Sequence, residues 1–257
     1  MRPPVVLAIA GSDPSGGAGL QADIRTCTAL GVYAAAVPTC ITVQDTRGVR
    51  RVEALAADLV REQIEVVIAD LAPQAIKVGL LPTRDVVTAV TASLSAHPAV
   101  PVVLDPVLVA TSGDELASPE SLAALIDLAR RAVLVTPNLA EAARLSGRAV
   151  NTQAEMVDAA RAIRDLGVEA VLVKGGHLAD EAVDVLIASD GEPIFLHAPR
   201  VAGPPVHGTG CALSAAIAAR LASGDSLPEA VRTAKVWLHG RIATAARLGR
   251  GSAVLLP

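Results

Sequence analysis

Short continuous apolar runs recur along the chain, and most are closed by glycine, proline or a polar residue. The first covers Val5 to Ala10, between Pro4 and Gly11. Apolar runs of this length without polar alternation are typical of strands that are buried on both faces of a parallel sheet. Further strands of this kind are predicted over residues 32–43, 75–78, 100–104, 133–136 and 170–173.

Between these runs, apolar residues recur at the spacing of one helix face. Helices are predicted over residues 20–30, 55–69, 83–95, 119–130, 153–166, 209–222 and 227–248. Strand and helix alternate without a linker, a low-complexity break or an internal repeat. This alternation predicts a single α/β domain, residues 1–257, with a doubly wound and mostly parallel sheet.

One stretch departs from the alternation. A polar turn at 189–192 (Ser-Asp-Gly-Glu) lies between the apolar runs 183–188 and 193–197. Two short runs joined by such a turn are typical of a hairpin. We therefore expect antiparallel strands late in the sheet.

Composition narrows the possible partners. Apolar residues make up 52% of the chain and aromatic residues only 1%, so the core must be built from aliphatic side chains. Scarce aromatics disfavour stacking on single-stranded nucleic acid. The formal net charge is -4, and no dense stripe of lysine and arginine offers a footprint for a phosphate backbone. Nucleic acid is therefore not an expected partner.

The three cysteines, Cys27, Cys40 and Cys211, form no C-x-x-C pair. An odd number without a disulfide framework predicts a reducing, cytoplasmic location. The first apolar run is too short for a signal-peptide core. The longest uncharged stretch, 26–44, is interrupted by Gly31 and Pro38, so we expect no membrane span.

A glycine turn near the C-terminus, Gly208-Thr209-Gly210-Cys211, runs into an alanine-rich helical stretch. The first N–H groups of a helix point outward with a partial positive charge, which suits a phosphate or an oxyanion. The same field is expected to lower the pKa of the Cys211 thiol. A glycine-started helix with a buried cysteine explains these residues equally well.

A second glycine-rich loop, 11–19, follows the first predicted strand. Its spacing is not G-x-G-x-x-G, and it has no P-loop lysine, so neither nucleotide fingerprint is present. The loop can still wrap a small ligand, with Asp23 on the next helix facing back toward it. A solvated helix charge is the simpler interpretation of Asp23.

Polar residues follow several predicted strands: Asp105, Asn138, Glu141 and Lys174. In a doubly wound sheet such loops converge along one edge. Lysine neutralises phosphate oxygens and carboxylates hold Mg²⁺ by way of water, so the set suits phosphoryl transfer. Asn138 and Glu141 also have the spacing of a helix capping box, which is an equally good interpretation of that pair.

Together these stretches resemble the ribokinase-like small-molecule kinases, and within them the hydroxymethylpyrimidine/phosphomethylpyrimidine kinases of thiamine biosynthesis. The matching stretches lie in family order and span nearly the whole chain, at 10–23, 42–48, 77–79, 104–107, 136–141, 173–177 and 207–211. The resemblance implies a three-layer α/β/α fold and a homodimer. It also implies an ATP- and Mg²⁺-dependent kinase that phosphorylates hydroxymethylpyrimidine and then its monophosphate.

The resemblance places the pyrimidine against Gly11, Ala18, Gln44 and Val107, with Asp23 near its polar edge. The amide of Gln44 both donates and accepts hydrogen bonds, which suits an aminopyrimidine edge.

The family pattern assigns the ATP phosphates to Lys174 and to the turn Gly208, Thr209, Gly210 and Cys211. Asp105 and Glu141, with Asn138 nearby, are implied as the metal end of the site. Lys235 on the last helix is implied as a neighbour of the nucleotide, although a solvated helix lysine is equally consistent.

Cys211 stands where sugar kinases of this superfamily typically carry aspartate. We infer that it assists deprotonation of the substrate hydroxymethyl group in the first phosphorylation. The chain departs from the family at its end, 248–257, and carries Asp45 where asparagine is common.

Other interpretations remain open. The nearest is a pyridoxine or pyridoxal kinase on the same scaffold. A cysteine hydrolase would use Cys211 with His207 or His177 as base. A noncatalytic nucleotide-binding module is the third.

Overall fold

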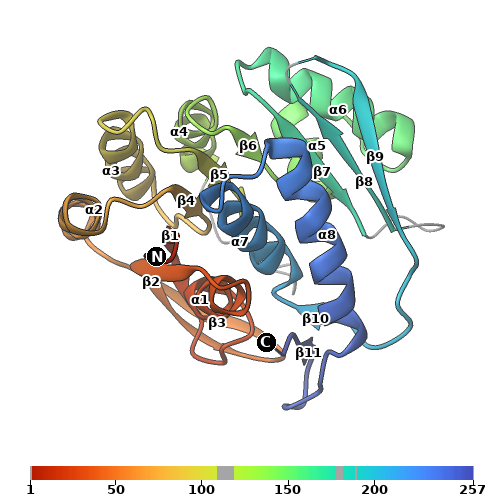
Figure 1. Ribbon diagram of the computed structural model, residues 1–257, viewed down its shortest axis with the longest axis horizontal. Helices are drawn as coiled ribbons and strands as arrows, with labels where there is room; N and C mark the ends of the chain where they lie inside the picture. Colours follow the sequence, from red (N-terminus) through yellow and green to blue (C-terminus); the bar gives the residue numbers. More distant parts are fainter. Residues whose placement is uncertain (1, 109–118, 177–181, 189, 257) are drawn as a thin grey trace.

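The computed structural model describes residues 2–108, 119–176, 182–188 and 190–256. One sheet runs through the molecule with the strand order β3-β2-β1-β4-β5-β6-β7-β8-β9 (Figure 1). Its strands are β1 (Val5–Ser12), β2 (Tyr33–Asp45), β3 (Gly48–Ala54), β4 (Ala75–Val78), β5 (Val102–Leu104), β6 (Leu134–Val135), β7 (Val171–Gly175), β8 (Ala182–Ile187) and β9 (Pro193–Ala198). The pairs from β2 to β7 are parallel, whereas β3, β8 and β9 are antiparallel to their neighbours.

Helices cover both faces of this sheet. They are α1 (Gly19–Ala29), α2 (Ala57–Leu71), α3 (Arg84–Ser95), α4 (Pro119–Ala129), α5 (Leu139–Ser146), α6 (Gln153–Asp165), α7 (Thr209–Ala222) and α8 (Leu227–Ala243). Helices α2 to α6 lie on one face, and α1, α7 and α8 lie on the other (Figure 1). The expected three-layer α/β/α arrangement with a mostly parallel sheet is confirmed.

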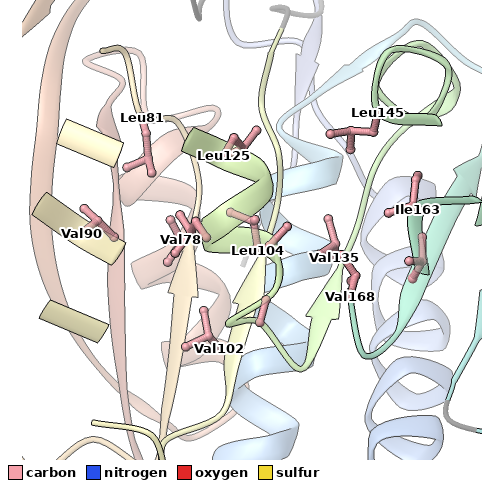
Figure 2. Close-up of a cluster of buried hydrophobic side chains, with 14 of the residues drawn as sticks. Val78, Leu81, Val90, Val102, Leu104, Leu125, Val135, Leu145, Ile163 and Val168 are labelled. Atoms are coloured by element: carbon pink, nitrogen blue, oxygen red, sulfur yellow. The ribbon is translucent and has the colours of Figure 1, made fainter. Parts of the chain in front are cut away.

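The core is aliphatic, as the composition requires. Figure 2 shows Val78, Leu104 and Val135 of the strands facing Val90 and Leu125 of the helices. Burying one such side chain contributes about 1.5–3 kcal/mol. The strands are thus packed by apolar side chains on both faces, and they provide a fixed support for the loops at the carboxyl edge of the sheet.

The C-terminal segment differs from the prediction of a helix over 227–248. Helix α8 ends at Ala243, and the backbone of Ala246 exchanges hydrogen bonds with Val254. Strand β11 (Ala253–Val254) then pairs with β10 (Val206–His207). Pairing between distant segments overrides helix propensity here, and local spacing cannot reveal it. The chain beyond Ala243 thus packs against the segment that precedes α7.

Strand β3 was also absent from the predicted elements. Its apolar run is interrupted by Arg50, Arg51 and Glu53 and no residue is buried, because β3 is an edge strand that pairs antiparallel with the long extension of β2. The late hairpin was predicted correctly as β8 and β9, although Ser189 of its turn lies outside the described residues. Among the residues described, no helix is long and apolar enough to span a bilayer.

Candidate functional site

A cavity of about 570 Å³ opens at the carboxyl edge of the sheet. The strand order reverses between β1 and β4, and ligands of open α/β sheets bind at such a switch point. All but one of the candidate residues line this cavity, namely Gly11, Ala18, Gln44, Asp105, Val107, Asn138, Glu141, Lys174, Gly208, Thr209, Gly210, Cys211 and Lys235. The exception is Asp23.

Lys174 lies near the end of β7 and lines the cavity. Its Nζ lies 2.6 Å from Oδ1 of Asp105, which also accepts a hydrogen bond from Thr136. Burial alone would lower the pKa of Lys174, but Asp105 and Glu141 outweigh burial and raise it. The side chain is therefore a fixed ammonium that faces the cavity.

Asn138 and Glu141 form the predicted capping box at the start of α5. Glu141 Oε2 accepts from the backbone N–H of Asn138 at 2.8 Å, and Asn138 Oδ1 accepts from that of Glu141 at 2.9 Å. Burial, helped by Asp105 and opposed by Lys174, raises the pKa of Glu141 to about 7. The pair thus caps a helix and also presents a poorly hydrated carboxyl group to the cavity.

The glycine turn packs directly beside Lys174. Gly208 has φ 78°, and a side chain there would strike the carbonyl of Gly17, so only glycine fits. A Cβ on Gly210 would lie 3.1 Å from Nζ of Lys174. The N-cap residue Gly208 has no side chain to cap the first turn of α7, which leaves the N–H groups of that turn to face an anion next to the ammonium.

The expectation for the Cys211 thiol was wrong in sign. Burial raises the pKa of Cys211 to about 11, although the ammonium of Lys77 opposes the rise. Loss of hydration therefore outweighs the field of the helix start. The thiol lines the cavity in its neutral form at neutral pH.

Asp23, which we expected near the polar edge of the substrate, does not line the cavity. Its carboxylate is fully buried. Nζ of Lys77 donates hydrogen bonds to its two oxygens, at 2.9 and 2.7 Å. Lys77 itself lines the cavity. Burial raises the pKa of Asp23 to about 6 against the pull of Lys77, which keeps the carboxylate ionised at neutral pH. Asp23 is thus the buried counter-charge of a cavity lysine and not a solvated helix charge.

Lys77 itself was missed by the sequence reasoning. A lysine inside the short strand β4, whose residues are all buried, was a usable signal, because such a charge requires a buried partner. Gly79 makes room for it, since a Cβ there would lie 2.8 Å from Nζ of Lys77.

Gln44 lies near the end of β2 and also lines the cavity. Its side-chain amide is 2.8 Å from Nε2 of His207, which is 3.3 Å from Oδ2 of Asp13. Asp13 and Thr42, which also contacts the amide, had not been singled out. The glycine turn and Gln44 are joined through His207, the residue immediately before Gly208.

Lys235 of α8 reaches the cavity as an ion pair. Its Nζ lies 2.6 Å from Oδ2 of Asp184 in β8, while Oδ1 of Asp184 accepts the N–H of Gly175. The simple alternative of a solvated helix lysine is wrong, because the side chain is mostly buried. Asp184 had not been anticipated.

The geometry gives little support to a cysteine hydrolase. Nε2 of His207 faces Gln44 and Asp13, and within the described residues no hydrogen bond joins this ring to Cys211. The neutral thiol of Cys211 is also a poor nucleophile. The other proposed base, His177, lies outside the described residues.

Comparison with known proteins gives a consistent result. The family described as phosphomethylpyrimidine kinase matches residues 13–255. A hydroxymethylpyrimidine/phosphomethylpyrimidine kinase of Rhizobium meliloti is 50% identical, over 96% of this chain and 95% of its own length.

Two solved structures are similar over almost their whole length. Phosphomethylpyrimidine kinase of Clostridium difficile superposes with a TM-score of 0.82 at 38% identity, covering 93% of this chain and 99% of that one. An ADP complex of Bacillus subtilis pyridoxal kinase superposes with a TM-score of 0.91 at 33% identity, covering 99% of this chain and 97% of that one.

Proposed function

Because the chain belongs to the phosphomethylpyrimidine kinase family, we propose that the cavity at the carboxyl edge of its sheet is the active site. The enzyme is a kinase of thiamine biosynthesis that phosphorylates hydroxymethylpyrimidine and then its monophosphate. Like other kinases of this family, it uses ATP.

One observation carries the assignment. The ammonium of Lys174 lies beside the start of α7 in the cavity wall, and the amide of Gln44 lines the same cavity. The lysine and the helix start neutralise and position phosphate oxygens, and the amide offers hydrogen bonds to a heteroaromatic ring. A phosphoryl donor and a pyrimidine therefore fit into one cavity.

We assign Lys174 and the N–H groups of Thr209, Gly210 and Cys211 to the transferring phosphoryl group. The lysine stays charged because Asp105 and Glu141 raise its pKa. Gly210 has no side chain between the turn and Lys174, which lets phosphate oxygens reach both. Charge that spreads over these oxygens in the transition state is thereby stabilised. Asn138 and Lys235 line the same cavity.

Asp105 and Glu141 are the proposed magnesium residues. The described residues contain no cluster of three acidic, histidine or cysteine side chains, so protein ligands alone do not enclose a metal. Two carboxyl groups beside a phosphate position suit Mg²⁺, which keeps several of its waters. When bound there, Mg²⁺ would neutralise phosphate charge.

Ala18, Gly11 and Val107 supply small and aliphatic walls of the same cavity, and we assign them to the pyrimidine ring. In the first step the small thiolate fraction of Cys211 accepts the proton of the hydroxymethyl group as the oxygen bonds to phosphorus and ADP leaves. In the second step the nucleophile is a phosphate oxygen that is already ionised, so no base is required.

A coupled assay that detects ADP release tests the whole assignment. Hydroxymethylpyrimidine and its monophosphate should both be turned over, and Lys174→Met should slow both steps by at least about a hundredfold, as loss of a transition-state contact does. No turnover of either compound by the wild-type protein would contradict the function. Unchanged rates in Lys174→Met would contradict the site.

Pyridoxal is the second candidate substrate, because the superposition on a pyridoxal kinase is so close. The same assay with pyridoxal and pyridoxine separates the two. A higher kcat/KM for a B6 vitamer than for hydroxymethylpyrimidine would reverse the preference.

We also propose that the chain forms a homodimer. The support is the family resemblance together with Ile41 and Val43, which leave 55% and 50% of their surface exposed on the outer face of β2. Adjacent apolar side chains of this kind favour a protein contact.

A further inference from the structure

Gln44 belongs to a chain of side chains that runs from β2 to the first glycine-rich loop. Thr42 Oγ1 lies 3.2 Å from one end of its amide and 3.0 Å from the carbonyl of Ser12. The other end of the amide lies 2.8 Å from Nε2 of His207, which is 3.3 Å from Oδ2 of Asp13. The oxygen and nitrogen of an amide have nearly the same shape, so the hydrogens available decide which end is which.

If the amide nitrogen of Gln44 points toward His207, the donors and acceptors of these contacts do not match. Thr42 has one hydroxyl hydrogen and would have to donate to both Ser12 and the oxygen of Gln44. Nε2 of His207 would have to be bare to accept from Gln44, and its lone pair would then face the carboxylate of Asp13. Two acceptors in contact repel, so this orientation leaves two contacts unfavourable.

Rotating the amide by half a turn satisfies every contact. Thr42 donates to Ser12 and accepts from Nε2 of Gln44. Nε2–H of His207 is then shared between Oε1 of Gln44 and Oδ2 of Asp13. Each of these contacts then joins a hydrogen to an acceptor, and none joins two acceptors.

We propose that His207 is a positioning residue that fixes the Gln44 amide with its oxygen toward His207 and its nitrogen toward Thr42. His207 lies in β10, directly before the glycine turn that begins at Gly208. A residue beside the proposed phosphate site thus sets which hydrogen bonds Gln44 offers to the substrate.

Asp13 is well suited to hold this arrangement. Burial alone would raise the pKa of Asp13, but hydrogen bonds from His207, Ser15 and Ala18 lower it, so the carboxylate is ionised and can only accept. Its Oδ2 also takes the N–H of Ala18 at 2.8 Å. The carboxylate therefore requires a hydrogen on Nε2 of His207.

The imidazole has little freedom to turn away. A Cβ on Gly17 would lie 2.5 Å from Cδ2 of His207, so the ring packs directly on the backbone of the first loop. On its other side, β10 pairs with β11, where His207 is opposite Val254. Position and hydrogen-bond direction are thus both fixed.

The consequence concerns specificity and rests on the proposed function. A fixed Gln44 offers one N–H on its Thr42 side and one oxygen lone pair on its His207 side. A ring nitrogen that accepts, next to an exocyclic amine that donates, matches this order. A 4-oxo analogue has a hydrogen on the ring nitrogen and an accepting oxygen, which is the reverse order. Its N–H would face the N–H of Gln44, and its oxygen would face the oxygen of Gln44.

Nitrogen NMR of the full chain labelled with ¹⁵N-histidine tests the proposal without any substrate. The chain has five histidines, and the His207 signals are those that disappear in His207→Gln. We expect a hydrogen on Nε2 at mildly alkaline pH. A bare Nε2 with the hydrogen on Nδ1 would overturn the proposal, whether or not the protein is a pyrimidine kinase.

Binding of the aminopyrimidine and of its 4-oxo analogue gives the second test, by calorimetry. In His207→Phe, which has no donor, the ratio of the two dissociation constants should shift toward the oxo analogue by about tenfold, the effect of one hydrogen bond. His207→Gln keeps an N–H donor and should largely preserve the ratio. His97→Gln is the matched control, because His97 lies outside the cavity.

An equal loss of affinity for both compounds in His207→Phe would overturn the proposal, because a purely structural role weakens both alike. If the wild-type protein binds neither compound, the proposed function fails while the NMR result stands by itself.

Discussion

At the scale of single residues, burial decides which groups carry charge in the cavity. It raises the pKa of Cys211 to about 11 and that of Glu141 to about 7, while Lys174 stays charged because two carboxyl groups face it. Loss of water around Cys211 disfavours its thiolate form. The same loss of water strengthens the hydrogen bonds that the cavity offers to phosphate.

The raised thiol pKa predicts how the two phosphorylations depend on pH. If the thiolate of Cys211 accepts the hydroxymethyl proton, the first step should accelerate about tenfold per pH unit until the pH approaches about 11. The second step should be nearly flat. Initial rates of each step against pH check this. In Cys211→Ala the slope of the first step should vanish, and equal losses in both steps would contradict a base specific to the first.

Glu141 predicts a pH-dependent stability difference. A carboxyl group whose pKa rises on folding binds its proton more tightly when folded, so its contribution is present at acid pH and lost as the pH rises from 4.5 toward about 7. Glu141→Gln keeps an oxygen for the capping box and removes the titration. We expect the variant to gain about 2 kcal/mol relative to wild type between about pH 5 and about pH 8.

Urea unfolding at several pH values measures this difference. A gap between variant and wild type that is the same at every pH would show that the titration of Glu141 plays no part. Activity should fall in the same variant if the carboxylate helps to hold magnesium.

At the scale of elements, the Lys77–Asp23 pair joins β4 to α1 beneath the cavity. Both side chains are fully buried, and the two oxygens of Asp23 converge on one ammonium. Removing one partner of such a pair leaves an uncompensated charge, whereas replacing both with apolar groups of similar size is close to neutral.

Lys77→Met should therefore destabilise the protein by about 3–5 kcal/mol, and adding Asp23→Leu should restore most of that loss. Activity should not return in the double variant, because Lys77 also faces the cavity. Denaturant unfolding and the ADP-release assay give the two readouts. The exposed pair Arg61–Glu65, with Nη1 and Oε1 2.9 Å apart, is the control, and Arg61→Met should change stability little. A double variant as unstable as Lys77→Met would contradict the pairing argument.

At the scale of the whole molecule, the sheet edge gathers residues that lie far apart in the sequence, from Gly11 to Lys235. Buried strands were predictable because their apolar runs are local, and the edge they define brought most candidate residues together correctly. Pairings between distant residues were not predictable. Lys77 with Asp23 and Lys235 with Asp184 depend on the packing of helices against strands, and the sign of the Cys211 pKa shift depends on burial.

The homodimer predicts the effect of charges on the outer face of β2. Ile41→Lys with Val43→Lys should convert a dimer to a monomer in light-scattering chromatography, because two desolvated charges oppose association. Val66→Lys on α2 is the control, since Val66 is 65% exposed outside that face. A monomeric wild-type protein would contradict the proposal, and a double variant that stays dimeric would exclude this face. The cytoplasmic location stays a prediction.

The segment after α8 has a mechanical consequence. Gly251 and Ser252 donate backbone hydrogen bonds to Thr46 in the β2–β3 connection, and Ala253 donates to Pro205 beside β10. Arg247 and Arg250 lie just before these hydrogen-bonded residues and are exposed. Both are therefore accessible cleavage sites for trypsin. A single cut there would weaken the contact between the β2–β3 hairpin, which contains Gln44, and β10, which contains His207. A bound pyrimidine contacts Gln44 and should stabilise this arrangement. It should therefore slow trypsin digestion at this point more than ATP does.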